Sequence, residues 1–234
     1  MKKEVFIKIK DINIKIHDVI NIIITILDAR DPYTYTHSER VAELSVRIAE
    51  DMGLLPDHIE KIHIAAHLHD VGKIGVPDTV LNKPGKLNDV DMIQIQSHSR
   101  IGYNILRELA PFQEISDIVL HHHERYDGRG YPDGIKGEDI PIESRIIAVA
   151  DSFDAITSDR PYRNGLSYEV GFDEINKHNG DQFCPLIVEH FNNILNDIPP
   201  LINKCNDSII QHSAFVGHEE LLHSRKIIMP NIVY

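Results

Sequence analysis

From about residue 18 onward, the apolar residues of this chain recur with the spacing of an α-helix. Apolar residues at i, i+3, i+4 and i+7 form one stripe along a helix, and that stripe must be buried against other helices. Residues 1–16 alternate apolar and polar instead, which predicts an extended arm. Convincing strands joined by hairpin turns are missing from the sequence. The pattern therefore predicts an all-α protein, folded as a helical bundle.

The sequence also carries signals for where the helices begin and end. Gly53 ends the second helix, Pro56 introduces the third, Asn88 has the chemistry of an N-cap for the fourth, and Pro111 starts the fifth. The helices are expected at residues 18–29, 37–52, 57–70, 88–107, 111–124, 142–157, 167–178 and 185–196.

Three stretches rich in Gly and Pro interrupt the helices, at residues 71–87, 125–141 and 159–165. Long ordered loops are uncommon inside a compact bundle and are often functional. The sequence shows no internal repeat and no low-complexity linker. We therefore expect one domain over residues 31–197. An N-terminal extension with the first helix precedes it at 1–30, and a C-terminal extension at 198–234 carries a short helix near 215–226.

Composition excludes several classes of protein. A net charge of −12 argues against binding a nucleic-acid polymer. The longest apolar run, residues 19–27, is too short to span a membrane, and its charged flank does not resemble a signal peptide. The two cysteines form no pairing motif, which favours a reducing, cytoplasmic location. The 15 histidines, most of them inside patterned segments, indicate metal binding.

Candidate metal ligands recur at regular distances along the chain. The intervals between His37, His69, His98, His122 and Asp151 are between 24 and 32 residues, about one helix and its return loop. Successive helices of a bundle can each deliver one or two ligands to a single interior point.

The helical phase supports this arrangement. His37 continues the apolar stripe formed by Val41 and Leu44, and His98 continues the stripe that includes Ile101. On the expected helix 57–70, the adjacent His69 and Asp70 straddle the continuation of the inward stripe. A histidine beside a carboxylate is a plausible metal anchor, because a carboxylate can bridge two divalent ions.

Residues 121–123 are three consecutive histidines, and they cannot all point the same way. On a helix over 111–124, His122 lies near the middle of the inward face. His121 and His123 flank it at comparable angles, so helical phase alone does not choose between them.

Five segments together resemble the HD-GYP family, the HD-superfamily phosphohydrolases that hydrolyse the bacterial second messenger cyclic di-GMP. The similarity extends over roughly residues 30–195, in the family's order. The segments are "HSERVAELSVRIA" (37–49), "HLHDVGKIGVPDTVLNKPGKL" (67–87), "SHSRIG" (97–102), "HHERYDGRGYPDG" (122–134) and "VADSFDAITSDRPYR" (149–163). The resemblance implies an HD-superfamily helical bundle with a metal centre in its core.

The resemblance implies two metal ions that share one carboxylate. The first ion would be bound by His37, His69, Asp70 and Asp151, and the second by Asp70, His98, His122 and His123. Two such cations would activate a water molecule and neutralise the phosphodiester. The His and carboxylate ligands suit iron or manganese, between which the sequence does not decide. Some family members bind a third ion with a glutamate that is replaced here by Tyr33, so we expect two.

The resemblance also implies contacts with the substrate. Lys73 would stabilise negative charge on the scissile phosphate, although a lysine at the end of a helix is also favoured by the helix dipole. Arg160 and Arg163 would contact phosphate or guanine; without the resemblance they read as surface residues. Tyr131 and the loop 128–132 would form a wall of the substrate pocket, with packing as the alternative role of Tyr131.

Four more residues are candidates for supporting roles around the centre. Glu124, Asp127 and Asp154 are candidates for hydrogen bonds that orient the ligand histidines, with local stitching of the loop as the alternative. Gly130 is expected to adopt a backbone conformation that other residues resist.

The function that the resemblance implies is hydrolysis of cyclic di-GMP to pGpG, with further cleavage to GMP left open, and with Asp70 and Lys73 in the catalytic site. Every ligand position is filled, which disfavours an inactive copy. One alternative is a non-catalytic module that senses cyclic di-GMP or docks on a diguanylate cyclase or sensor protein. Another is an HD phosphohydrolase acting on a different nucleotide, such as cyclic GMP-AMP. The apolar helix 18–29 is a candidate for pairing two copies as a homodimer.

Overall fold

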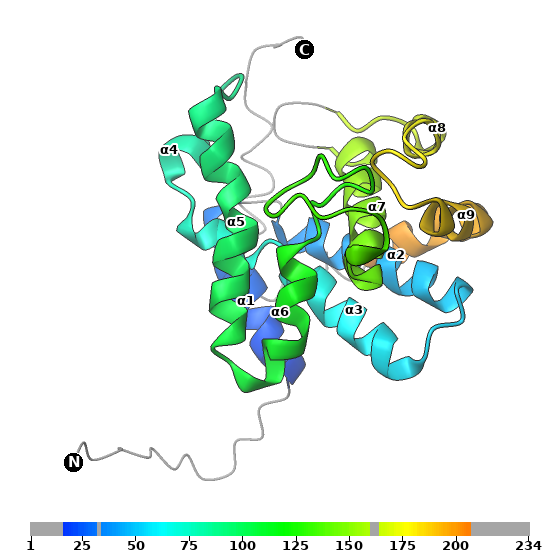
Figure 1. Cartoon of the computed structure of the whole chain (residues 1–234), viewed down its shortest axis with the longest axis horizontal. Coiled ribbons are helices and arrows are strands. Elements are labelled where there is room, and N and C mark those ends of the chain that lie inside the picture. Colours follow the sequence, from blue (N-terminus) through cyan, green and yellow to red (C-terminus); the bar gives the residue numbers. More distant parts are fainter. Residues whose placement is uncertain (1–15, 32–33, 160–163, 207–234) are drawn as a thin grey trace.

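A computed structural model describes residues 16–31, 34–159 and 164–206 of the 234-residue chain (Figure 1). Residues 1–15 of the expected arm and the helix expected near 215–226 lie outside these described residues. The same holds for Tyr33, Arg160 and Arg163.

The described residues are mostly helical, and the all-α prediction is confirmed. The principal helices are α1 (Ile16–Arg30), α2 (Thr34–Asp51), α3 (Pro56–Leu68), α4 (Asp78–Leu81), α5 (Asp89–Arg107), α6 (Gln113–Leu120), α7 (Ile142–Thr157), α8 (Tyr168–Lys177) and α9 (Pro185–Asn193). Short 3-10 turns are η1 (Val71–Gly75), η2 (Ala110–Phe112), η3 (Gly137–Asp139) and η4 (Leu195–Asp197). Residues 198–206 are also helical. Within the described ranges the only β-type pairing is an isolated bridge between Asn179 and Phe183.

The start of α5 follows the expected capping chemistry. The side chain of Asn88 accepts a hydrogen bond from the backbone N–H of Asp91 at 2.9 Å, and the carboxylate of Asp91 accepts one from the backbone N–H of Asn88 at 2.9 Å. This reciprocal pair satisfies two backbone donors that no helical carbonyl reaches. The N-cap prediction for Asn88 is confirmed.

Several helices end earlier than the periodicity predicts, and two of these ends matter for the site. α3 ends at Leu68 rather than at residue 70, and α6 ends at Leu120 rather than at residue 124. After α6, the backbone N–H of Glu124 donates to the carbonyl of His121 at 3.0 Å, which closes a turn. Residues 69–70 and 121–123 therefore lie in turns, and the spacing of side chains on a helix does not determine where they point.

The core is formed by one cluster that includes the first helix. Val41, Leu44 and Ile48 on α2 are fully buried, and Ile20 on α1 is 1% exposed in the same cluster. Ile198, beyond α9, is also buried in it. Burial of such a side chain stabilises the fold by about 1.5–3 kcal/mol. The predicted domain boundaries after residues 30 and 197 stay predictions, and apolar side chains from both sides of each boundary share this core.

The helices surround the segments that carry the candidate ligands. The long loop between α6 and α7 lies between α5 and α7, and α2 and α3 pack together beside them (Figure 1). α8 and α9 pack against α7 on the other side. Among the residues that the structure describes, no helix has both the length and the apolar character that a membrane span requires.

Candidate metal centre

Five parts of the fold deliver their side chains to one place in the bundle. α2, α5 and α7 contribute residues from within helices, and the turns after α3 and α6 contribute the rest. The seven residues that the sequence predicted as ligands meet there: His37, His69, Asp70, His98, His122, His123 and Asp151. The structure thus brings the whole predicted ligand set together.

These side chains form two groups, with Asp70 between them. The ligand atoms of His37, His69 and Asp70 lie within 4.8 Å of one another, and so do those of His98, His122 and His123. Oδ2 of Asp70 lies 3.3 Å from Nε2 of His69 and 3.9 Å from Nε2 of His37. Oδ1 of Asp70 lies 3.6 Å from Nε2 of His98. Oδ1 of Asp151 lies 3.2 Å from Nε2 of His37. One oxygen of Asp70 faces each group.

Three histidines of the centre, His69, His98 and His122, are held in one tautomer by their outer nitrogens. Nδ1 lies 2.7 Å from the Ala66 carbonyl in His69, 2.7 Å from the Ile95 carbonyl in His98, and 2.6 Å from the Val119 carbonyl in His122. A carbonyl only accepts, so Nδ1 of each ring must carry the proton and donate. The lone pair of Nε2 is then directed towards the cluster, as metal coordination requires.

A divalent metal fits these residues. Nε2 of His69 is buried and has no hydrogen-bond partner among the described residues. Buried polar atoms in proteins are nearly always satisfied, so such an atom requires a reason. A cation between the Nε2 atoms and the carboxylates would supply that partner, and neutral imidazole with carboxylate is a donor set for iron, manganese or similar ions.

The charge of Lys73 complements the carboxylate that both groups share. Nζ of Lys73 lies 2.8 Å from Oδ2 of Asp70 and 3.5 Å from Oδ2 of Asp31. Burial opposes ionisation of Asp70. The charge of Lys73, together with His69 and His98, outweighs burial and holds the pKa of this carboxyl well below its usual range. The two carboxylates likewise raise the pKa of Lys73 against burial, so both groups are charged.

The two ends of the centre differ in their electrostatics. Burial disfavours a charge on His37, but its hydrogen bonds with Asp151 and Asp154 outweigh burial and raise its pKa to about 9. At the other end, burial and the neighbouring rings lower the pKa of His123 to about 3 and hold that of His122 well below its usual value. His122 and His123 are therefore neutral at pH 7, which is the form that binds a cation.

Arg40 is a residue of the site that the sequence reasoning missed. Nδ1 of His37 donates to Oδ2 of Asp154 at 2.8 Å, and Nη2 of Arg40 donates to the same oxygen at 3.1 Å. Nε of Arg40 and Oγ of Ser158 donate to Oδ1, so the carboxylate is held from three sides. Arg40 follows His37 by three residues, which places both on one side of α2. That spacing is the signal by which it could have been found.

The turn after α6 separates the three consecutive histidines. His122 and His123 face the centre, whereas Nε2 of His121 lies 3.3 Å from Oδ2 of Asp133 in the following loop. The expected helix to residue 124 was wrong, because the chain leaves α6 at Leu120. A turn allows neighbouring side chains to point in different directions, and helical phase does not describe them.

The loop that follows folds back over the centre. The ring of Tyr131 lies 4.9 Å from that of His123, at an interplanar angle of 31°. A Cβ atom on Gly130 would lie 2.3 Å from the backbone nitrogen of Arg125, so Gly130 is required by close packing rather than by an unusual φ. The positive φ angles of this loop belong instead to Gly128 (+79°), Gly134 (+66°) and Gly137 (+62°). Tyr131 thus lies beside the centre, and its role as a wall of the substrate pocket stays a prediction.

Glu124 and Asp127 support the loop, whereas Asp154 supports a candidate ligand. Oε1 of Glu124 accepts from the backbone N–H groups of Asp133 and Gly134, at 2.7 and 2.9 Å. Asp127 pairs with the guanidinium of Arg125 at 2.8 Å and with that of Arg129 at 2.6 Å. Of the three predicted supporting carboxylates, Asp154 alone is hydrogen-bonded to a histidine of the centre within the described residues.

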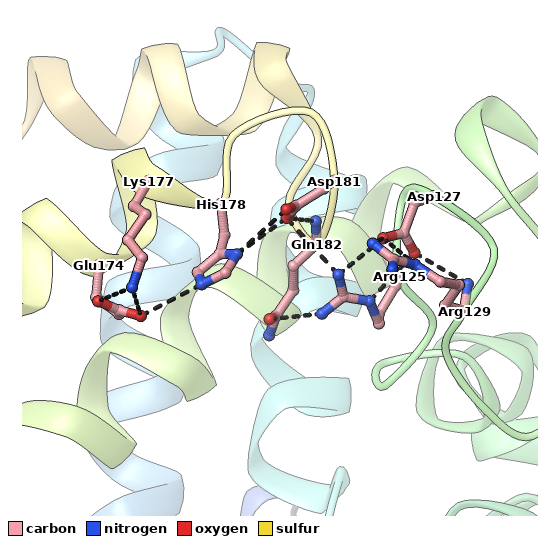
Figure 2. Close-up of polar contacts among 8 residues, drawn as sticks. All are labelled: Arg125, Asp127, Arg129, Glu174, Lys177, His178, Asp181 and Gln182. Atoms are coloured by element: carbon pink, nitrogen blue, oxygen red, sulfur yellow. Dashed lines mark hydrogen bonds and ion pairs between the residues drawn. The ribbon is translucent and has the colours of Figure 1, made fainter.

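The base of this loop is joined to the turn between α8 and α9. Figure 2 shows polar contacts that run from Glu174 and His178 through Asp181 to Arg125 and Asp127. Nη1 of Arg125 donates to Oε1 of Gln182 at 2.8 Å, and the backbone N–H of Asp127 donates to the carbonyl of Asp181 at 2.7 Å. The loop that carries Tyr131 is therefore attached to the turn between α8 and α9.

The bundle and its buried His and Asp cluster define a helical protein of the HD type. The chain belongs to the HD domain family, whose model matches residues 21–186. The resemblance to the HD-GYP subgroup is confirmed by the relatives that follow.

Two relatives and one solved structure illustrate the similarity. The chain is 39% identical over 219 residues to a cyclic di-GMP phosphodiesterase of Thermotoga maritima, covering 93% of this chain and 59% of the relative. It is 42% identical over 141 residues to 3'3'-cGAMP-specific phosphodiesterase 3 of Vibrio cholerae, covering 60% of this chain and 31% of the relative. A crystal structure of a cyclic GMP-AMP-specific phosphodiesterase of V. cholerae has a TM-score of 0.62 at 20% identity, covering 84% of this chain and 53% of that one. The chain thus spans about three fifths or less of the length of each.

Proposed function

We propose that this chain is a metal-dependent phosphodiesterase that hydrolyses cyclic di-GMP to pGpG. The relative that matches over 93% of the chain is named a cyclic di-GMP phosphodiesterase. The observation that carries the proposal is the position of Asp70, with one carboxylate oxygen towards each of the two groups of histidines. A carboxylate in this position could bridge two cations, and two neighbouring cations can act together on one phosphate.

Two divalent ions are proposed at the centre, and iron or manganese is favoured by the donor set. His37, His69, Asp70 and Asp151 would hold one ion, and Asp70, His98, His122 and His123 the other. Ions bound in this way supply Lewis acidity and lower the pKa of water at the scissile phosphate.

The chain's own residues would bind and orient the substrate. Lys73, charged and 2.8 Å from Asp70, would place its ammonium group beside the phosphate, where it stabilises the negative charge that develops during hydrolysis. Tyr131, stacked near His123, would exclude water from one side and contact the substrate. Arg160 and Arg163 remain proposed contacts to phosphate or guanine, at positions outside the described residues.

A second substrate is favoured by one specific observation. The relative that is 42% identical over 141 residues is named as specific for 3'3'-cGAMP. Cyclic GMP-AMP has the same two phosphodiesters as cyclic di-GMP and differs in one base, so the same centre can act on both. Contacts to the bases, rather than the metal ligands, would then decide the preference.

Side-by-side turnover tests the proposal. Anaerobically purified protein, loaded with Fe(II) or Mn(II), would be mixed with cyclic di-GMP and, separately, with 3'3'-cGAMP. We expect pGpG from the first at a higher rate than product from the second, and chromatography would reveal whether GMP follows. Binding of cyclic di-GMP without turnover would instead favour a sensing or docking module, and turnover only of other nucleotides would favour a general HD phosphohydrolase.

The remaining expectations concern location and partners. Cys184 and Cys205 are both free and buried, which fits the proposed cytoplasmic location. Ile22 and Ile26 on α1 are 58% and 52% exposed, which fits the proposed pairing of two copies. Docking on a diguanylate cyclase or a sensor protein is a further expectation. Light scattering of the purified chain would test the homodimer directly.

A further inference from the structure

Arg30, the last residue of α1, is bonded to the turn that carries Lys73. Its Nη1 donates to the carbonyl of Lys73 at 2.9 Å and also to the carbonyl of Ile74. Its Nη2 donates to the carbonyl of Val76. Its Nε donates to Oδ1 of Asp78 at 2.8 Å. One guanidinium group thus contacts three backbone carbonyls and one carboxylate, all within a six-residue segment.

The other side of the same turn is packed directly against α5. A Cβ atom on Gly72 would lie 1.8 Å from the carbonyl oxygen of His98, so only glycine permits this approach. A Cβ atom on Gly75 would lie 2.8 Å from Cδ1 of Ile101, also on α5. The η1 turn is therefore held between α5 on one side and Arg30 on the other.

The end of α1 also contacts the ammonium group of Lys73. Asp31, the residue after Arg30, has Oδ2 at 3.5 Å from Nζ of Lys73, while Asp70 has Oδ2 at 2.8 Å. Neighbouring residues at the end of the first helix thus contact both the backbone and the side chain of Lys73.

We propose that Arg30 is a positioning residue, which acts on the reaction by fixing the η1 turn and thereby the ammonium group of Lys73. The inference rests on the proposed phosphodiesterase function for its activity readout. By this proposal, α1 contributes to the reaction through Arg30, which it holds against the turn that carries Lys73.

The guanidinium group is suited to this role. Its planar fork offers five donors in fixed directions, whereas a lysine offers one compact ammonium on a flexible stem. Lysine at position 30 would keep the positive charge near Asp78 but would not serve three carbonyls at once. A displacement of about 1 Å at a catalytic group can lower the rate by about 10²-fold, so a loosened turn is expected to slow the reaction.

The experiment compares Arg30→Ala, Arg30→Lys and the control Arg47→Ala. Arg47 lies on α2 and pairs with Asp197 at 2.7 Å, in another part of the bundle. Turnover of cyclic di-GMP and of bis(p-nitrophenyl) phosphate would be measured with the Mn(II)-loaded full chain, together with metal content and hydrogen exchange of residues 71–78. For Arg30→Ala we expect kcat to fall about 10- to 100-fold, with the metal content unchanged and faster exchange confined to 71–78. Arg47→Ala is expected to match the unmodified chain.

A double variant separates positioning from general structural damage. If Arg30 acts through Lys73, adding Arg30→Ala to Lys73→Ala lowers kcat by no more than about twofold further, because the group being positioned is already gone. A further tenfold loss in that background would overturn the proposal. So would full kcat in Arg30→Ala, or unchanged exchange at 71–78. If Arg30→Ala does not fold, Arg30→Lys decides: it must fold, bind metal and still lose kcat.

The outcomes also separate this proposal from the proposed function. Failure of the unmodified chain to hydrolyse cyclic di-GMP, with hydrolysis of bis(p-nitrophenyl) phosphate retained, would reject the substrate and leave the test of Arg30 intact. If neither is hydrolysed, hydrogen exchange at residues 71–78 decides for or against the link between Arg30 and the turn.

Discussion

Nδ1 of His37 donates a hydrogen bond to Oδ2 of Asp154 across 2.8 Å, although the two residues are 117 positions apart in the chain. Asp154 is 1% exposed and also accepts from Arg40, which is 5% exposed. This contact orients the imidazole and leaves its Nε2 facing Asp70 and Asp151. Asp154 and Arg40 therefore determine how the imidazole of His37 is oriented towards the centre.

Replacing Asp154 with Asn is expected to lower metal affinity by about 10- to 100-fold, because the amide no longer holds the ring of His37 with a charge. Metal titration of the purified chain would measure this. Asp173→Asn, at an exposed position on α8, is the matched control. Unchanged affinity in Asp154→Asn would contradict a role for this carboxylate at the centre.

Asp70→Ala is expected to abolish turnover and to lower the bound metal, because both groups of histidines lose the carboxylate between them. Elemental analysis and product chromatography would measure the two effects together. A variant that kept two metal ions and full turnover would exclude the shared-carboxylate arrangement.

His121→Ala and His122→Ala are expected to behave differently although the residues are adjacent. His122 faces the centre, so its loss should reduce bound metal, whereas His121 contacts Asp133 and its loss should leave metal content nearly unchanged. A moderate rise in KM is expected for His121→Ala, because Asp133 helps to hold the loop of Tyr131. Equal metal loss in both variants would show that the turn after α6 is arranged differently.

Asp154 and His37 contribute to the stability of the metal-free chain with opposite dependence on pH. His37 and Arg40 outweigh burial and hold the pKa of Asp154 below its ordinary value, so its contribution to stability is present above about pH 4 and is lost as the pH falls further. The pKa of His37 is raised to about 9, so its contribution is complete below about pH 6.5 and is lost as the pH rises through 9. Denaturant unfolding with a chelator present should therefore give maximal stability from this pair between about pH 4 and 6.5. In Asp154→Asn the free energy of unfolding should fall less steeply as the pH drops below about 4. An unchanged fall would assign the acid sensitivity to other groups.

The thiol of Cys205 is expected to be unreactive in the native chain. Burial, with the carboxylates of Glu43 and Glu39, raises its pKa to about 12, and the side chain is 4% exposed. A thiolate is the reactive form, so an aromatic disulfide reagent at pH 8 should label Cys205 only after denaturation. Mass spectrometry of labelled peptides would measure this, with Cys184, also 4% exposed, as an internal comparison. Rapid labelling of Cys205 alone would mean that the helical residues 198–206 do not stay packed on the bundle.

Local patterns in the sequence were sufficient to predict most of the helices and several of the candidate ligands, and the resemblance to the HD-GYP family supplied the complete ligand set. Helical periodicity depends on residues three and four positions apart, and a cap such as Asn88 acts on its own first turn, so both can be recognised without knowledge of the fold. The resemblance of "HHERYDGRGYP" to the family's motif selected His122 and His123 over His121, a choice that helical phase left open.

Only the tertiary structure decided how these residues meet. α3 ends at Leu68 and α6 at Leu120 because the chain beyond each helix packs against distant segments, as Gly72 does against His98. Packing between distant segments also brings an oxygen of Asp70 to His98, Arg40 to Asp154, and Arg30 to the η1 turn. Each of these contacts joins residues or helices that lie far apart in the chain. Their geometry follows from the packing of the whole bundle, which no local pattern of residues records.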